Sequence, residues 1–238
     1  MDPISQFAVR EFTRVNFFGN EVVITNSNIT TLIISICCII FMYLGTRNTS
    51  EVPSKIQLLF ENIVLFVENM LNSVTKGNAK KFFPLVFCLF IFVLLSNLYG
   101  MIPFTFSITS QFLVTTGLAL IVFFISTIYG LVKHKARFFS IFAPAGTPLW
   151  LMPLMIVIEI MAYFMKPISL SLRLAANMCA GHILIKVIAS LASNIVLAPF
   201  FALFVGGLMA FEVCICILQA YIFTMLTCVY INDVVNLH

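Results

Sequence analysis

Long apolar segments fill this chain of 238 residues almost without interruption from residue 29 onward. Charged residues make up only 9% of the chain and apolar residues 61%, whereas a water-soluble domain carries roughly 25% charged residues. Thirteen basic and nine acidic side chains cannot cover the surface of a soluble body of this size. We therefore expect one polytopic, all-α membrane domain, and we exclude disordered, collagen-like and nucleic-acid-binding classes.

Three apolar segments are long enough to cross a membrane as upright helices. They are residues 29–45, 82–102 and 112–132. About 20 apolar residues in a helix cover the ~30 Å of hydrocarbon in a bilayer. The mixed, polar residues 1–28 lack the pattern of a cleavable signal peptide, so we expect the mature chain to begin close to its first residue.

Residues 51–76 combine charged side chains with apolar residues at helical spacing, for example Phe60, Ile63 and Val67. This pattern predicts an amphipathic helix along the membrane surface. Basic residues collect in the wider stretch from Arg47 to Lys81 and again directly after the third predicted span. The positive-inside rule assigns both basic stretches to the cytoplasmic or matrix side and the amino terminus to the outside. Residues 138–148 contain two Pro and one Gly, which predicts an interfacial connector.

Two segments near the carboxyl terminus, residues 149–193 and 197–231, are too long for upright spans. At 1.5 Å per residue, the 35 residues of the second make about 52 Å of helix against ~30 Å of hydrocarbon. Strong tilt or a break is therefore required. An uncharged turn joins the segments and predicts a hairpin of two long, strongly tilted helices. Small residues such as Gly181, Gly206 and Gly207 would allow a neighbouring helix to approach closely.

Ionisable side chains inside these two segments are costly in lipid, at roughly 2.5 kcal/mol or more each, so each one needs a partner, water or a function. In the first segment Glu159, Lys166 and Arg173 repeat every seven residues and stay near one helix face. Ser169 and Asn177 flank Arg173 at four residues on either side. This spacing predicts a polar stripe centred on the arginine.

A second set of polar residues faces elsewhere. His182 lies nine residues beyond Arg173, which is about 180° around a helix. In the second segment Glu212 and Gln219 are seven residues apart and Tyr230 is eighteen from Glu212, so the three lie within about 20° of one another. The spacing predicts a helix hairpin that holds side chains able to bind and release protons.

The seven cysteines lie in or beside apolar runs, where a thiol packs like a small hydrophobic group. We expect all of them to be free. Cys214 and Cys216 are two residues apart, but no second Cys or His pair accompanies them, so we expect no metal site and no cofactor.

The run KPISLSLRLAANMCAGH at Lys166–His182 resembles the signature of subunit a of rotary ATP synthase, the static half of its proton channel. The resemblance continues in Glu212–Tyr230 and in Asn97–Pro103, and it covers roughly residues 29–238. It implies a stator subunit of the membrane sector that forms two aqueous proton half-channels against the rotating c-ring. The chain itself would make no ATP, since catalysis belongs to other subunits.

The resemblance also implies roles for individual residues. Arg173 would separate the half-channels and favour the ionised form of each ring carboxylate. Arginine suits this role because it cannot be deprotonated in a protein, whereas a lysine could titrate. Three residues would relay protons: Glu159, His182 and Glu212. Four would give polar support: Ser169, Asn177, Gln219 and Tyr230. The resemblance assigns no role to Lys186.

The implied partners are the c-ring, the peripheral stalk, other membrane-sector subunits and membrane lipid, with no nucleic acid. A histidine after the arginine, together with a glutamate in the last helix, is similar to the mitochondrial and related bacterial pattern. We therefore expect a multi-pass protein of the mitochondrial inner membrane, with a bacterial plasma membrane as the alternative.

Other interpretations of the same residues stay open. A self-contained secondary transporter could bind a substrate at the charged stripe, although the sequence has no self-similar halves. A quinone- or haem-linked subunit would need several helix histidines, whereas only His182 lies inside a predicted span. Arg173 could instead be a structural residue paired with Glu159 or Glu212. If the resemblance holds, replacing Lys166 should be harmless by comparison with replacing Arg173.

Overall fold

A computed structural model describes most of the chain, and every structural statement below concerns this part. The described residues are 11–17, 20–47, 54–77, 79–102, 105–142, 150–191 and 198–235. Most of the hairpin turn predicted at Ser193–Pro199 and most of the predicted connector lie outside them.

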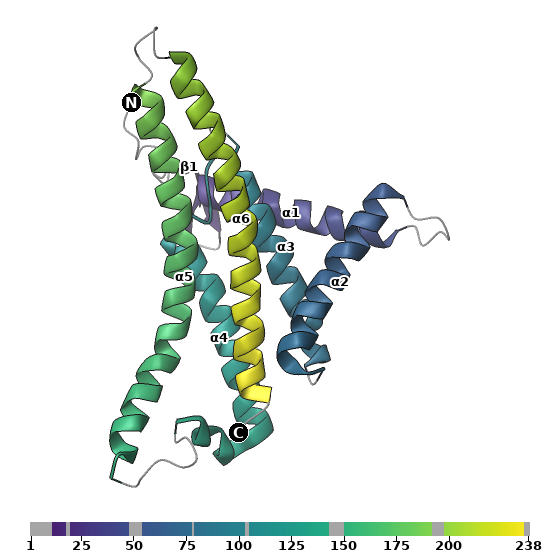
Figure 1. Cartoon of the computed structure of the whole chain (residues 1–238), viewed down its shortest axis with the longest axis vertical. Coiled ribbons are helices and arrows are strands. Elements are labelled where there is room, and N and C mark those ends of the chain that lie inside the picture. The colour runs from purple at the N-terminus through teal and green to yellow at the C-terminus, as the bar shows by residue number, and fades with distance from the viewer. Residues whose placement is uncertain are drawn as a thin grey trace.

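Six α-helices dominate the described residues (Figure 1). They are α1 (Asn26–Thr46), α2 (Lys55–Thr75), α3 (Phe83–Gly100), α4 (Phe112–His134), α5 (Met152–Leu191) and α6 (Ala198–Val235). Two 3-10 helices lie at Lys80–Phe82 and Lys135–Phe142. Five segments are long and apolar enough to cross a membrane, and α2 is the α-helix that does not qualify. This agrees with the prediction of a helical, polytopic membrane protein.

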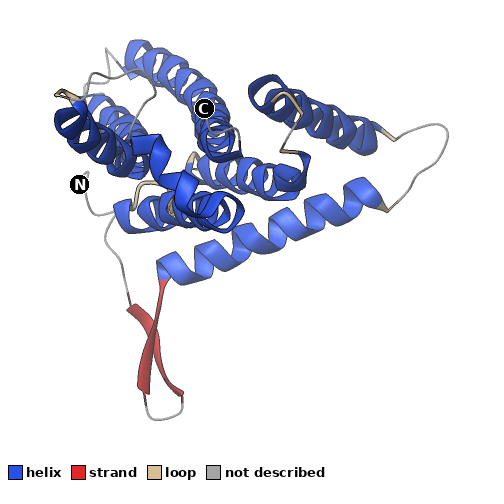
Figure 2. Ribbon diagram, turned by 90° about the horizontal axis from the view of Figure 1, so that it is seen from below, coloured by secondary structure: helices blue, strands red, loops and turns tan. Residues whose placement is uncertain are grey.

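The segment before α1 forms a β-hairpin that the sequence analysis did not predict. Strands β1 (Glu11–Phe17) and β2 (Asn20–Thr25) pair antiparallel, and Figure 2 shows them projecting from the helical body. The β-branched residues Val22, Val23 and Ile24 favour an extended conformation. Helix α1 starts directly after this strand, three residues earlier than expected.

Helix α2 lies within the range predicted for the amphipathic helix. Its first turn is capped by Ser54, whose side chain accepts a hydrogen bond from the backbone N–H of Gln57 at 3.3 Å. The helix ends where Lys76 adopts a left-handed conformation, with φ of 51°. One face buries apolar residues such as Phe60 and Val67 against α1, α3 and α6, while the rest of the helix exposes polar side chains together with large apolar ones such as Leu58 and Leu59.

Helix α3 lies at the centre of the packing. In its apolar window 44% of the residues are buried, compared with 17–22% in the other four candidate spans. It contacts α1, α2 and α6, whereas α4 packs on α5 and α6. The remaining spans therefore leave wide apolar surfaces that only lipid or another protein can cover.

Helices α5 and α6 are long, unbroken and side by side (Figure 1). They contain 40 and 38 residues, which corresponds to about 60 and 57 Å. Helix α5 continues through Pro167, so the break that length alone allowed does not occur there. Helix α1 runs across the direction of both helices in Figure 1, and Figure 2 again shows α1 side-on.

Candidate functional site

Helix α5 presents two different polar surfaces. Ser169, Arg173 and Asn177 lie on an exposed face of the chain, on three successive turns of the helix. His182 is only 8% exposed and lies on the buried side. The helical spacing predicts this opposition, because nine residues correspond to about half a turn beyond two full turns.

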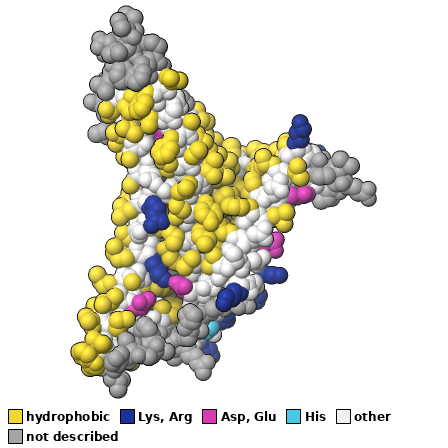
Figure 3. All heavy atoms as spheres, in the orientation of Figure 1, with side chains coloured by type: hydrophobic (Ala, Val, Ile, Leu, Met, Phe, Trp, Pro, Cys, Tyr) yellow, Lys and Arg dark blue, Asp and Glu magenta, His cyan; other side chains and the backbone are white. Residues whose placement is uncertain are grey.

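Exposed apolar side chains border Arg173 on either side of this polar row. Its exposed neighbours include Ile168 and Leu172, which are 42% and 49% exposed. Within the described part of the chain, neither Glu159 nor Glu212 forms an ion pair with it, so the structural pairing left open by the sequence is absent there. Figure 3 shows basic groups over α5 and α6 that are bordered by apolar side chains, with acidic groups beside the lower of them.

The side chain of Glu212 is packed against the backbone of α5. It is 5% exposed, and a Cβ atom placed on Gly181 would overlap with its carboxylate. Among the described residues neither of its carboxylate oxygens has a hydrogen-bond partner. Gly181 directly precedes His182 in α5, so the structure brings the acid to the part of the helix that carries the histidine.

The three glycines of the hairpin, Gly181, Gly206 and Gly207, differ in how closely other groups approach them. Close approach was predicted at all three positions, and at Gly181 it is a side chain that approaches. At Gly206 and Gly207 an added Cβ would meet no atom of the described chain within 4 Å. These two positions are exposed, and no described part of the chain approaches them closely.

The second polar stripe lies on the buried side of α6, as its spacing predicts for Glu212 and Gln219. Gln219 is 6% exposed, and Cys216 between them is fully buried. The Nδ2 atom of Asn97, at the end of α3, donates to the Cys216 carbonyl oxygen at 3.2 Å. The sequence indicated Asn97 only as part of a motif, and its place beside this stripe was not predicted.

Lys166 has a charged partner in the other long helix of the hairpin. Its Nζ atom donates to Oδ2 of Asp233 in α6 at 2.8 Å. The same ammonium group lies 5.7 Å from the ring centroid of Tyr163 and 5.4 Å from that of Tyr230. The Tyr230 hydroxyl donates to the Lys166 carbonyl oxygen at 3.4 Å. The sequence analysis missed Asp233, because a seven-residue repeat within one helix cannot reveal a partner in another.

These contacts change what we expect of Lys166. Replacing Lys166 with Ala should lower the melting temperature of the chain in its complex by about 2–4 °C. A partly exposed ion pair and a cation–π contact together contribute about 1 kcal/mol, which in a chain of this size corresponds to that shift. The effect is measured by thermal unfolding of the purified complex, with the protease sensitivity of α5 as the readout.

Two further variants make this prediction specific. Replacing Asp233 with Asn should give a shift of similar size, and the double variant should shift little further, because both variants break one ion pair. Replacing exposed Lys76 with Ala at the end of α2 is the control. If the melting-temperature shift of the double variant equalled the sum of the two single shifts, the pair would not couple α5 to α6.

The remaining candidate residues lie in mixed environments. Glu159, Lys186 and Tyr230 are half-buried. All seven cysteines are free thiols. In the described ranges no group of three or more His, Cys, Asp or Glu residues is placed to hold a metal ion. The candidate residues are therefore spread along two helices rather than gathered in one cluster.

Comparison with known families gives an independent result. A family model described as the ATP synthase A chain matches residues 28–232. The match begins at the amino-terminal part of α1 and ends near the carboxyl end of α6, so it includes every candidate residue described above. Because it covers far more than half of the sequence, the chain belongs to the ATP synthase A chain family.

Proposed function

We propose that this chain is the stationary half of a rotary proton path, in which the exposed face of α5 meets the rotating c-ring. As a member of its family the chain is a multi-pass, proton-translocating subunit of the ATP synthase membrane sector. The observation that carries the finer proposal is Arg173, which stands on an exposed face bordered by apolar side chains, with neither candidate glutamate paired to it.

Because neither candidate glutamate pairs with Arg173 in the described part of the chain, we infer a partner for its charge outside the chain. Its guanidinium cannot lose its proton, and a charge left in lipid costs roughly 2.5 kcal/mol or more. A ring carboxylate that passes this face would relieve that cost when it is ionised. A protonated carboxyl group carries no charge and would not relieve it. The arginine thereby favours proton release on arrival and blocks a direct proton path between the two half-channels.

The buried side of the hairpin supports a proton relay. Glu212 and His182 are both ionisable, both nearly inaccessible, and belong to neighbouring parts of α6 and α5. A buried carboxylate without hydrogen-bond partners needs water or a proton, and a half-channel supplies both. Half-buried Glu159, on another part of α5, would serve the second half-channel. Ser169, Asn177, Gln219 and Tyr230 would support these groups with hydrogen bonds.

The lengths of α5 and α6 support strong tilt in the membrane. If α1, with its 21 residues, crosses the bilayer, the two longer helices run across that direction (Figure 1). A tilted pair brings a long stretch of α5 alongside the ring, so that Arg173 and the groups on either side of it can act on successive ring positions.

The setting follows from the family and from the pattern of the residues. The other partners would be the peripheral stalk, further membrane-sector subunits and lipid. The arrangement of His182 before Glu212 supports the mitochondrial inner membrane, with a bacterial plasma membrane as the alternative. Family membership argues against the self-contained transporter and the redox subunit, because neither belongs to an ATP synthase.

Photo-crosslinking tests which face of the chain meets the ring. We would place a photoreactive phenylalanine analogue at Leu172, beside Arg173, and irradiate the intact complex. The matched control is Ile36 on α1, which is 47% exposed where Leu172 is 49% exposed. We expect crosslinks to the c subunit from position 172 and none from position 36. Crosslinks from position 172 to lipid alone would contradict the proposal.

Gly181 offers a second test, aimed at the relay. Replacing it with Ala should reduce ATP-driven proton pumping about tenfold to a hundredfold, because the new methyl group displaces the Glu212 carboxylate and small misplacements cost that much in rate. Gly206→Ala is the control, since its methyl group would meet nothing in the described chain. Pumping equal to wild type in Gly181→Ala would show that the position of this carboxylate does not matter.

A further inference from the structure

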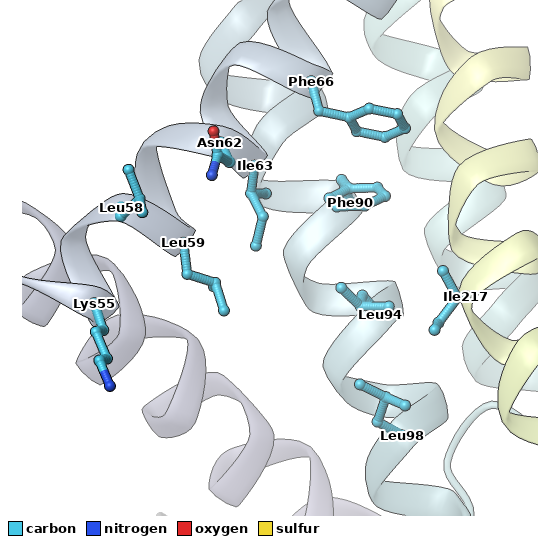
Figure 4. Close-up of a pocket in the computed structure, with 10 residues that line it drawn as sticks. All are labelled: Lys55, Leu58, Leu59, Asn62, Ile63, Phe66, Phe90, Leu94, Leu98 and Ile217. Carbon is cyan, nitrogen blue, oxygen red and sulfur yellow. The ribbon is translucent and has the colours of Figure 1, made fainter.

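A groove lies on the side of the molecule away from α5, between α2, α3 and α6 (Figure 4). Its volume is about 520 Å³. Helix α2 contributes one wall with Leu59 and Ile63, and α3 contributes the other with Leu94 and Leu98. Ile217 of α6 lies at its far side. None of the residues assigned to the proton path lines it.

The lining of the groove is apolar except at two positions. Apart from Lys55 and Asn62, every lining residue is Leu, Ile or Phe. Leu58, Leu59 and Phe66 are about half exposed. In a membrane protein such a surface is covered either by lipid chains or by the helix of another subunit.

The shape and composition of the lining favour a lipid chain. Transmembrane helices pack closely where small residues let their backbones approach, and this lining contains no Gly, Ala or Ser. The wall formed by Phe90, Leu94 and Leu98 is about 12 Å long, little more than the diameter of one helix. A second helix would therefore find little length to pack along.

The charge at one end of the groove indicates the kind of lipid. Lys55 is exposed, belongs to the first residues of α2, and is the one charged group in the lining. The first turn of α2 contains no acidic residue, so the positive end of the helix dipole adds to its charge. The positive-inside rule assigns this stretch to the cytoplasmic or matrix surface, where lipid phosphates lie.

We propose that this groove binds an acyl chain of an anionic phospholipid, with the lipid phosphate beside Lys55 and the chain along Leu94. The lipid would fill the gap between the surface helix α2 and the membrane helix α3, and so hold the two together. This site is separate from the proton path and does not rest on it.

Lipid photolabelling of the whole complex tests the site. The complex would be reconstituted into phosphatidylcholine vesicles that contain a trace of phosphatidylglycerol with a photoreactive group in one acyl chain. Labelled residues are identified by mass spectrometry after irradiation. We expect label on Leu59 and Leu94. Absence of label from the groove, or a crosslink from the groove to another subunit, would overturn the proposal.

Two variants separate the roles of charge and shape. Lys55→Glu should reduce labelling by phosphatidylglycerol about fivefold or more and leave labelling by a matched phosphatidylcholine probe unchanged. Lys76→Glu, at the opposite end of α2, is the control and should change neither. Leu94→Trp should fill the groove and reduce labelling by both probes. Labelling by phosphatidylglycerol that is equal in Lys55→Glu and wild type would refute the assigned headgroup position.

Discussion

Replacing Arg173 with Ala is expected to abolish gradient-driven ATP synthesis by the complete complex and to open a passive proton leak. An opposite charge within about 4–6 Å favours the ionised form of a carboxylate by a factor on the order of 10 to 1,000. Without the arginine each ring carboxylate would keep its proton as it passes α5, and the ring could carry protons from one half-channel to the other. Reconstituted vesicles report both quantities, ATP formed and passive proton flux.

Two comparisons make this result interpretable. Arg47→Ala removes a guanidinium that stacks on Tyr43 at the end of α1, 5.8 Å from the ring centroid, and should leave both quantities unchanged. Arg173→Lys keeps a charge but one that can titrate, so synthesis should fall without reaching zero. Intact coupling in Arg173→Ala would contradict the mechanism.

Replacing Glu212 with Gln should give the second largest effect, with a different signature. The amide keeps the size of the carboxyl group but cannot bind and release a proton. A positioned proton-transfer group contributes about 100-fold to 10,000-fold in rate, so ATP-driven pumping and ATP synthesis should both fall by about 100-fold or more. Passive leak should stay at the wild-type level, because the arginine barrier is intact.

The control for Glu212 is a carboxylate of the same type elsewhere in the chain. Glu68→Gln neutralises a side chain of α2, outside the hairpin of α5 and α6, and should leave pumping unchanged. Glu212→Asp keeps an acid about one bond shorter and should restore part of the activity. Wild-type pumping in Glu212→Gln would remove this residue from the proton path.

The sequence predicted the helices because lipid imposes a simple constraint on it. A membrane helix needs a long apolar segment, and the spacing of polar residues on it shows which of them share a face. The opposite placement of Arg173 and His182 on α5 followed from this periodicity alone. The common face of Glu212 and Gln219 on α6 followed in the same way.

Contacts between helices could not be predicted from that periodicity. The pairing of Lys166 with Asp233 joins residues 67 positions apart, and nothing in either helix indicates the other partner. The contact of Glu212 with Gly181 depends equally on how α5 and α6 are aligned. The small residue at 181 was a signal of close approach, but it did not identify the group that approaches.

The β-hairpin and the groove show two further limits. Strands β1 and β2 are short, and apolar and polar residues do not alternate regularly along them. Composition therefore suggested only a polar segment. The groove needs three helices at once, and each of its residues taken alone is an ordinary apolar residue of an amphipathic or membrane helix. A pattern along the chain describes one element at a time.

The most direct measurement is a structure of the complete membrane sector at side-chain resolution. The account predicts that the guanidinium of Arg173 lies within about 4–6 Å of a ring carboxylate, with α5 running alongside the ring. It predicts also that Glu212 lies on the opposite side of α5 from the ring, beside Gly181. An Arg173 side chain that instead contacts lipid headgroups, with no ring carboxylate near it, would contradict the central claim.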